Sequence, residues 1–279
     1  MTRRLRITIL SDNTAVGRGV RGEHGLAFWI EMDAHRVLFD TGQGLVLADN
    51  AHALGVDLGS MEAVVLSHGH YDHTGGWAQV LRAAAGSVTV YAHPEVLAPK
   101  FKRDEGGIRD VGMPAAFREM LMAGRIPRVW SRTPVEIVPR LWTTGEIPRR
   151  HSEEAITESF LTEREGEQRP DPLLDDQAMF IETDRGPVVL LGCAHAGVIN
   201  TLDHIRSLLS ETPIHAVIGG MHLGSAAPER LDWTIRELRR FTIGRLVPLH
   251  CTGQKAHAAL GTAFPDTCGG GGAGCIFEF

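Results

Sequence analysis

The sequence is poor in the features that mark several common classes of protein. Only four of its 279 residues are cysteine and none is at Cys-x-x-Cys spacing, which excludes a zinc ribbon and a thioredoxin-type motif. No apolar run reaches the roughly 18 residues of a membrane span. Lys and Arg number 28 against 34 Asp and Glu, so no basic excess favours nucleic-acid binding. We therefore expect a cytoplasmic protein with free thiols, and neither a nucleic-acid nor a membrane partner.

What the chain does contain is enough apolar sequence for a sizeable core. Hydrophobic residues make up 43% of it and charged residues 22%. Short apolar segments such as Leu5–Leu10, Leu26–Ile30 and Val37–Phe39 predict strands, and Val198–Leu209 has the spacing of an amphipathic helix. Strands occur in both halves with helices between them. This order predicts an α/β fold in which two mixed sheets carry helices on their outer faces.

The most informative stretch is a histidine-rich run that follows a buried strand. Ala63–Leu66 is apolar, and the next ten residues read Ser-His-Gly-His-Tyr-Asp-His-Thr-Gly-Gly before a helical pattern begins at Trp77. Four side chains with metal-binding chemistry therefore lie in one strand-to-helix loop. They are His68, His70, Asp72 and His73.

Imidazole and carboxylate groups favour zinc, with manganese and iron as alternatives. A pair of such ions about 3.5–4 Å apart can share a hydroxide and polarise a substrate oxygen. We expect two zinc ions and a metal-bound hydroxide that attacks a carbonyl or phosphoryl centre. Asp72 would both ligate metal and orient this nucleophile.

Three later strands each end in a histidine, namely His195, His222 and His250. Strand ends that open into loops are where α/β proteins collect functional groups. We therefore expect these histidines to converge with the histidine-rich loop, and we assign His222 as a general acid or a partner of a substrate oxyanion.

The His-x-His-x-Asp-His run resembles the signature of the metallo-β-lactamase superfamily. The resemblance implies an αββα sandwich, and we expect a single domain, residues 1–279. The stretch at about 95–132, which is rich in Gly, Lys and Arg, is expected to be an insertion that covers the cleft. The resemblance also implies that His195 and His250 complete the metal site and that Asp40 orients a ligand imidazole from behind. Where the family usually has Gly-Asp, this chain has Gly192-Cys193. Cys193 is therefore a bridging thiolate, a packing residue, or a sign that His195 has replaced the aspartate.

Further segments resemble the dihydropterin-ribofuranosyl-aminobenzene-phosphate synthase-like branch of this superfamily. They are Ser11–Asn13, Glu23–Gly25, Asp175–Gln177, Gly192–Gly197, Gly219–Leu223 and His250–Gly253. We predict a metallohydrolase acting on an ester, lactone or phosphoester. One alternative is a transferase that condenses a pterin-like group with a phosphorylated aminobenzene ribofuranoside, and another is a metal-binding sensor without turnover.

The substrate is expected to be a small anionic molecule, and the sequence leaves open whether the protein is a homodimer. Basic residues of the insertion would select the anion through Lys100, Lys102, Arg103 or Arg109, and His24 and Thr252 are further candidates for substrate contact. The insertion has a helical pattern at Pro114–Ala123 but shows no sheet pattern. Residues 151–175 are charged and favour a solvated loop, with a second cleft-covering segment as the alternative.

Overall fold

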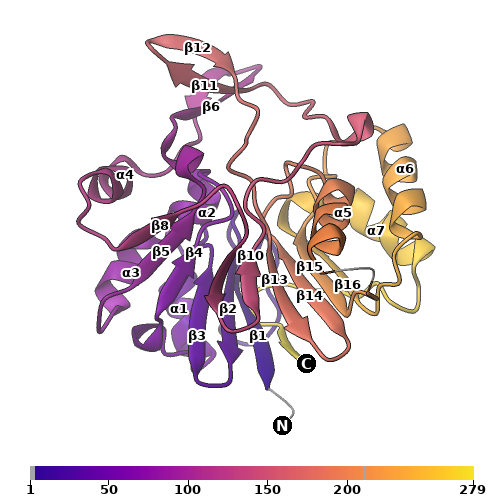
Figure 1. The fold of residues 1–279 in the computed structure, drawn as a ribbon, viewed down its shortest axis with the longest axis horizontal. Coiled ribbons are helices and arrows are strands. Elements are labelled where there is room, and N and C mark those ends of the chain that lie inside the picture. Colours follow the sequence, from indigo (N-terminus) through magenta and orange to yellow (C-terminus); the bar gives the residue numbers. More distant parts are fainter. Residues whose placement is uncertain (1–3, 210–211) are drawn as a thin grey trace. The chain divides into compact units, whose positions relative to one another are not determined.

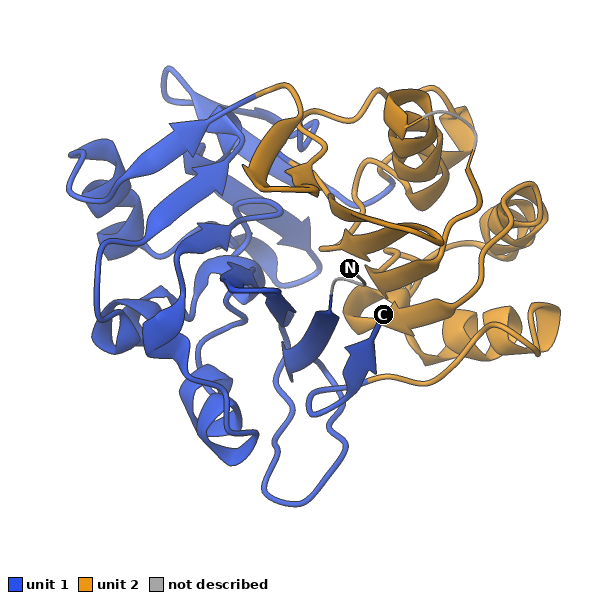
Figure 2. Ribbon diagram, turned by 60° about the horizontal axis from the view of Figure 1, so that its bottom comes forward, with its two compact units in different colours: residues 1–131, 157–175, 272–279 blue, residues 132–156, 176–271 orange. Residues whose placement is uncertain are grey.

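The computed structural model describes residues 4–209 and 212–279, which form two compact units (Figures 1 and 2). Unit 1 comprises Met1–Ser131, Thr157–Asp175 and Gly272–Phe279. Unit 2 comprises Arg132–Ile156 and Asp176–Gly271. The prediction of a single domain stays a prediction. Within the described residues, no helix has both the length and the apolar character needed to cross a bilayer.

Unit 1 is built on a mixed sheet of seven strands. The first four strands of the sheet order are antiparallel neighbours, and the last four are parallel neighbours. In order across the sheet they are β17 (Ile276–Glu278), β1 (Leu5–Ser11), β2 (Ala27–Met32), β3 (His35–Phe39), β4 (Ala63–Val65), β5 (Thr89–Ala92) and β8 (Arg128–Trp130).

Helices cover one face of this sheet (Figure 1). They are α1 (Leu47–Ala53), α3 (Trp77–Ala83) and α4 (Ala115–Met122), with the short 3₁₀ helices η1 (Leu58–Ser60) and η2 (Pro94–Leu97). The single turn of α2 (Tyr71–Thr74) lies in the loop between β4 and α3. Trp77 of α3 stacks on Phe117 of α4 with ring centroids 4.1 Å apart. Both rings are buried with alternate residues of the strands, such as Trp29 and Val64. Because alternate strand residues share a face, the strand pattern and the helix pattern together specify this core.

Unit 1 also contains a four-stranded antiparallel sheet, here called the small sheet. Its order is β12 (Glu167–Pro170), β11 (Phe160–Arg164), β6 (Lys100–Asp104) and β7 (Gly107–Asp110). Our expectation that 95–132 lacks a sheet was therefore wrong, as was the expectation of a loop throughout 151–175. The helix predicted near Pro114–Ala123 is confirmed, as α4. The outer strands β7 and β12 are exposed along their whole length, so no apolar alternation marked them.

Unit 2 is built on a mixed sheet of six strands. They are, in order, β16 (Leu246–Leu249), β15 (Ala216–Gly220), β14 (Gly186–Leu191), β13 (Met179–Thr183), β10 (Leu141–Thr143) and β9 (Val135–Val138). Strands β14, β15 and β16 are parallel, and the others pair antiparallel. The apolar run Val188–Leu191 is buried, as expected of a central strand, with β15 as its parallel neighbour and β13 as its antiparallel neighbour.

The helices of unit 2 are α5 (Val198–Leu209), α6 (Pro228–Leu238) and α7 (Gln254–Ala263), with η3 (Ser152–Glu154) and η4 (His250–Thr252). Their apolar faces pack with Val189, Val217 and other strand residues into one core. The connections β14–α5, β15–α6 and β16–α7 all leave the carboxyl ends of the parallel strands. This edge of the sheet collects three consecutive loops, as the strand-end histidines predicted.

Candidate metal centre

The histidine-rich loop of unit 1 connects β4 to α3 and contains the single turn of α2. All four of its metal-binding side chains are buried: His68 and His73 are 0% exposed, His70 5% and Asp72 7%. Polar groups at such depth require partners, because burial without them costs about 1–3 kcal/mol each. The loop is therefore stabilised by specific contacts within unit 1.

Asp40, at the end of β3, supports this loop from below. Its Oδ1 accepts a hydrogen bond from the backbone N–H of Ser67 (2.7 Å), and its Oδ2 accepts one from the Ser67 hydroxyl (2.6 Å). Oδ2 also lies 2.7 Å from His73 Nδ1. The contact fixes the orientation of the His73 ring and directs Nε2 away from Asp40.

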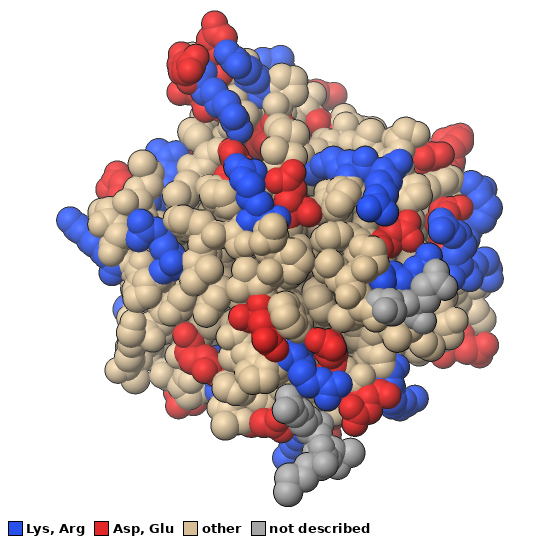
Figure 3. All heavy atoms as spheres, in the orientation of Figure 1, with Lys and Arg blue, Asp and Glu red and all other residues tan. Residues whose placement is uncertain are grey.

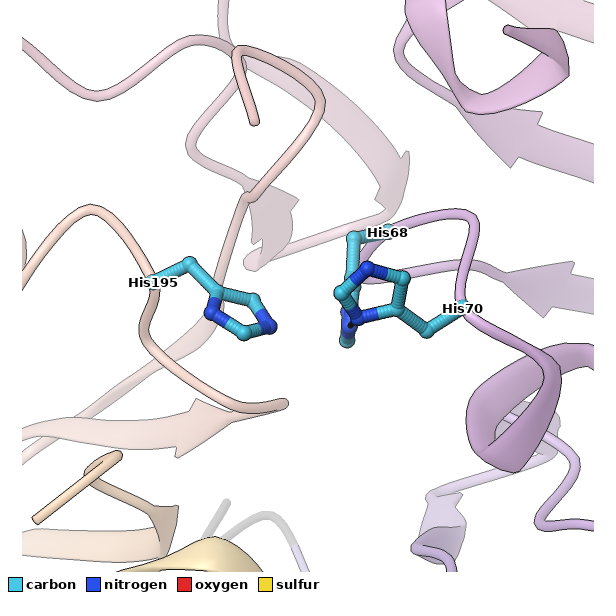
Figure 4. Close-up of side chains that lie close together, drawn as sticks. All are labelled: His68, His70 and His195. Atoms are coloured by element: carbon cyan, nitrogen blue, oxygen red, sulfur yellow. Dashed lines mark hydrogen bonds between the residues drawn. The ribbon is translucent and has the colours of Figure 1, made fainter. Parts of the chain in front are cut away.

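The rings of His68 and His70 lie against one another (Figure 4). His68 Nε2 is 2.9 Å from His70 Nδ1, while His68 Nδ1 is 2.9 Å from the Ser67 hydroxyl. Burial lowers the pKa of His70 to about 3, with Asp72 acting in the opposite direction. His70 is therefore neutral near pH 7, which is the form of histidine that binds metals.

Asp72 carries the carboxylate of the loop and has two histidine neighbours. Its Oδ2 is 3.7 Å from His73 Nε2 and 3.3 Å from Nε2 of His24. The His24 side chain is 55% exposed, so it links the buried carboxylate to the surface of unit 1. Unit 1 thus brings together five of the predicted site residues and Asp40.

In unit 2, the predicted histidines follow three parallel strands at the same edge of the sheet. His195 lies in the loop between β14 and α5 (Figure 4), His222 follows β15, and His250 begins η4 after β16. The His195 and His222 rings have centroids 4.3 Å apart. His222 and His250 both have positive φ angles, 48° and 49°. Such strain in non-glycine residues is typical of functional sites.

Two cysteines lie among these histidines. Potential donor atoms of Cys193, His195 and His222 lie within 4.8 Å of one another, as do those of Cys193, His250 and Cys251. Burial alone would raise the pKa of the Cys251 thiol, but hydrogen bonds with Cys193 and His222 bring it well below its usual range. Unit 2 therefore holds thiol and imidazole donors together. The three readings of Cys193 stay open.

The predicted substrate contacts differ in their surroundings. Thr252 is buried, and its hydroxyl accepts a hydrogen bond from the backbone N–H of Met221 (3.1 Å). Arg103 and Arg109 are exposed on the small sheet, and Arg109 forms an ion pair with Asp104 (3.2 Å). The expectation that Lys100 contacts an anionic substrate was wrong. Lys100 is buried between two carboxylates, with Nζ 2.8 Å from Asp175 and 3.1 Å from Asp171.

The structure also reveals buried carboxylates that support the loops and that the sequence analysis did not assign. Glu23 accepts N–H bonds from Gln43 (3.1 Å) and Leu45 (2.7 Å). Glu154 accepts N–H bonds from Ile199 (3.0 Å) and Asn200 (2.7 Å) in the first turn of α5. Glu23 lies in a segment already linked to the synthase-like branch, as do Asp175 and Asp176. That resemblance was the available signal.

Comparison of the chain with known protein families identifies its superfamily. The model of the metallo-beta-lactamase superfamily matches residues 20–250. The chain therefore belongs to the metallo-β-lactamase superfamily, and its α/β fold of mixed sheets is that of the family, as predicted.

Individual relatives agree with this assignment. The chain is 27% identical to the 7,8-dihydropterin-6-methyl-4-(β-D-ribofuranosyl)-aminobenzene-5′-phosphate synthase of Methanocaldococcus jannaschii, over 98% of this chain and 95% of the synthase. A crystal structure of a metal-dependent hydrolase of the β-lactamase superfamily has 30% identity and a TM-score of 0.85, covering 99% of both chains. Zinc-bound PqqB from Methylobacterium extorquens shares the fold, with a TM-score of 0.59 at 13% identity over 98% of this chain and all of that one.

Proposed function

We propose that this protein is a metal-dependent hydrolase that acts on a small anionic ester, lactone or phosphoester. The observation that carries the proposal is the buried donor set of the loop after β4, where two histidine nitrogens lie 2.9 Å apart and a third ring is oriented by Asp40. Three imidazoles and a carboxylate in one loop suit zinc, with manganese and iron as alternatives.

We further propose that His195 and His250 of unit 2 serve the same metal centre. Support comes from their position at the carboxyl ends of β14 and β16, and from membership of the superfamily over residues 20–250. The thiol of Cys193 would add a softer donor, which favours zinc over manganese. Bound metal would acidify a water molecule and polarise a substrate oxygen.

The residues around the donors would handle protons and bind the substrate. His24 reaches Asp72 from the surface and would exchange a proton with that carboxylate. His222 is half-buried at the end of β15 and would protonate the leaving group or hold an oxyanion. Replacing His222 with Ala should then lower turnover and leave the metal content unchanged. Loss of metal together with activity would make His222 a ligand.

A second candidate is the condensation carried out by the named synthase, because 95% of that enzyme is matched by this chain. Hydrolysis incorporates an oxygen atom of water into the product, whereas condensation joins two substrates without incorporating one. Turnover in ¹⁸O-labelled water should place one labelled oxygen in the product of a hydrolase, detected by mass spectrometry.

The substrate panel should contain phosphodiesters, lactones, thioesters and the pterin and phosphorylated ribofuranoside pair. A coupled pterin product without label would overturn hydrolysis in favour of condensation. Stoichiometric metal without turnover on any substrate would favour a sensor. The metal content of the purified protein is measured in parallel, so that an inactive preparation lacking metal is recognised.

A further inference from the structure

Two consecutive carboxylates each support one of the loops that carry the metal-binding histidines. Asp175 Oδ2 accepts a hydrogen bond from the backbone N–H of Gly69 (2.8 Å), between His68 and His70. Asp176 Oδ2 accepts one from the backbone N–H of Ala196 (2.8 Å), directly after His195. We infer that Asp175 and Asp176 are positioning residues for the metal centre, an inference that rests on the proposed function.

The first contact fixes the direction of a peptide group inside the donor loop. Gly69 separates His68 from His70, so the orientation of its N–H determines where both side chains project. The backbone approaches closely here, because a Cβ on Gly69 would lie 2.4 Å from the Val96 carbonyl oxygen and 2.9 Å from Lys100 Cε. The 2.9 Å separation of the two histidine nitrogens depends on this peptide.

Lys100 provides a positive charge beside the buried carboxylate of Asp175, with Nζ 2.8 Å from Oδ1. Asp175 and Lys100 are each 1% exposed, and Asp171 provides a second carboxylate for the ammonium group. Replacing a buried ion cluster by apolar side chains of similar size is often neutral or stabilising. Stability alone therefore does not explain the cluster. Its contact with Gly69 does, because an ionised acceptor makes a stronger hydrogen bond.

The second contact holds a strained loop. Ala194 has a φ of 55° and Gly197 a φ of 100°, on either side of His195 and Ala196. A Cβ on Gly197 would lie 2.1 Å from Oε2 of Glu154. Such a backbone persists only when its surroundings hold it. Asp176 supplies the N–H acceptor, and the Arg149 side chain donates to the His195 carbonyl oxygen (2.8 Å). One dipeptide thus provides an acceptor for each loop.

The test compares Asp175→Asn and Asp176→Asn with Asp171→Asn. Asp171 is the matched control, because it contacts Lys100 and the Leu173 N–H, which lies outside both donor loops. Each metal-free protein is titrated with Co²⁺, whose visible absorption reports ligand geometry, and zinc affinity is measured by chelator competition. Thermal unfolding of the metal-free proteins measures stability separately.

We expect Asp175→Asn and Asp176→Asn to bind zinc about 10- to 100-fold more weakly and to shift the Co²⁺ spectrum. Asp171→Asn should lose stability but keep affinity and spectrum. Asp175→Glu, which retains the charge beside Lys100, should recover stability but not the spectrum. If the 175 and 176 variants behave like Asp171→Asn, the inference is overturned. Absence of any Co²⁺ binding by the unaltered protein would instead overturn the proposed function on which it rests.

Discussion

At the scale of single residues, Asp40 combines an unusual backbone with a demanding side-chain role. Its φ is 59°, in the left-handed region, and its carboxylate meets Ser67 and His73. Asparagine tolerates that backbone at least as well as aspartate. An asparagine at this position therefore changes the charge next to His73 while leaving the local fold intact.

We predict that Asp40→Asn weakens zinc binding about 10- to 100-fold, because the amide supports the His73 ring less strongly than the carboxylate. Chelator competition on the folded protein measures the affinity. Asp33→Asn is the control, since Asp33 also has a positive φ (53°) but lies in the exposed turn between β2 and β3. Equal affinities for the Asp40 and Asp33 variants would show that Asp40 has no influence on the metal.

At the scale of elements, the sequence predicted the strands, helices and loops that are marked by a repeating apolar pattern. It did not predict features that depend on a single contact between residues far apart in the sequence. The loop after β4 and the strand-end histidines were visible because ligand residues follow apolar runs. The small sheet was missed because β7 and β12 are exposed and show no apolar alternation. The turn between β11 and β12 does contain a glycine, which is common in tight hairpins. Glu165 and Gly166, between β11 and β12, have φ angles of 55° and 79°, as a tight hairpin requires.

The support of the donor loops could not be predicted in the same way. Asp175 and Gly69 are 106 positions apart, and a single carboxylate-to-backbone contact leaves no periodic trace in the sequence. The role expected of Lys100 failed for the same reason, because its burial depends on strands β6 and β11 being paired. Contacts between residues so far apart in the sequence are created by the fold and can be recognised only once the structure is known.

The small sheet permits a sharper test of anion recognition. It carries basic and acidic side chains interspersed (Figure 3), and Lys102, Arg103 and Arg109 remain candidates for a phosphate contact. We predict that replacing these three by Gln raises KM for a phosphorylated substrate about tenfold, with little change for a neutral ester, because only the charged substrate loses attraction. Steady-state kinetics on both substrates measures this effect.

The control for this triple variant is Arg185→Gln, which removes a charge from the turn between β13 and β14 in unit 2. Lys100 must be left intact, because its loss would leave two buried carboxylates without their cation and cost about 3–5 kcal/mol of stability. A matching rise in KM for the neutral ester would contradict the electrostatic role.

The first turn of α5 gives a pH-dependent prediction. Burial raises the pKa of Glu154 above its ordinary value of 4.5, against the lowering effect of the Asn200 and Ile199 N–H groups. A raised folded pKa contributes stability that is fully present below the unfolded pKa and is lost as pH rises through the folded pKa. The contribution of Glu154 to the stability of the fold therefore begins to fall at a pH of about 4.5 and continues to fall as the pH rises.

We predict that the stability of the wild type relative to Glu154→Gln falls as pH rises from about 4 to about 7. Urea unfolding of both proteins across this range gives the difference in the free energy of unfolding, from which the titration of all other groups cancels. A pH-independent difference would show that Glu154 has the same pKa in the folded and unfolded chains.

At the scale of the whole molecule, the donors are divided between two units of the chain. His68, His70, Asp72 and His73 belong to unit 1, while His195 and His250 belong to unit 2. If both sets serve one metal centre, metal binding must link the stability of the two units. Any ion that binds the folded state alone stabilises it, by about 2.7 kcal/mol at a hundred times its Kd.

A double-mutant cycle on zinc affinity tests this sharing. His70→Ala and His195→Ala each remove one proposed ligand, and the double variant removes both. Ligands of one ion act as a unit, so the losses should be non-additive, with an interaction free energy of about 0.5–3 kcal/mol. The comparison cycle pairs His70→Ala with His215→Ala, because His215 contacts Thr183 (3.2 Å) and belongs to none of the donor groups, and its losses should add. Additive losses for His70 and His195 would mean that each unit binds its own ion, and the proposal of a shared metal centre would then fail.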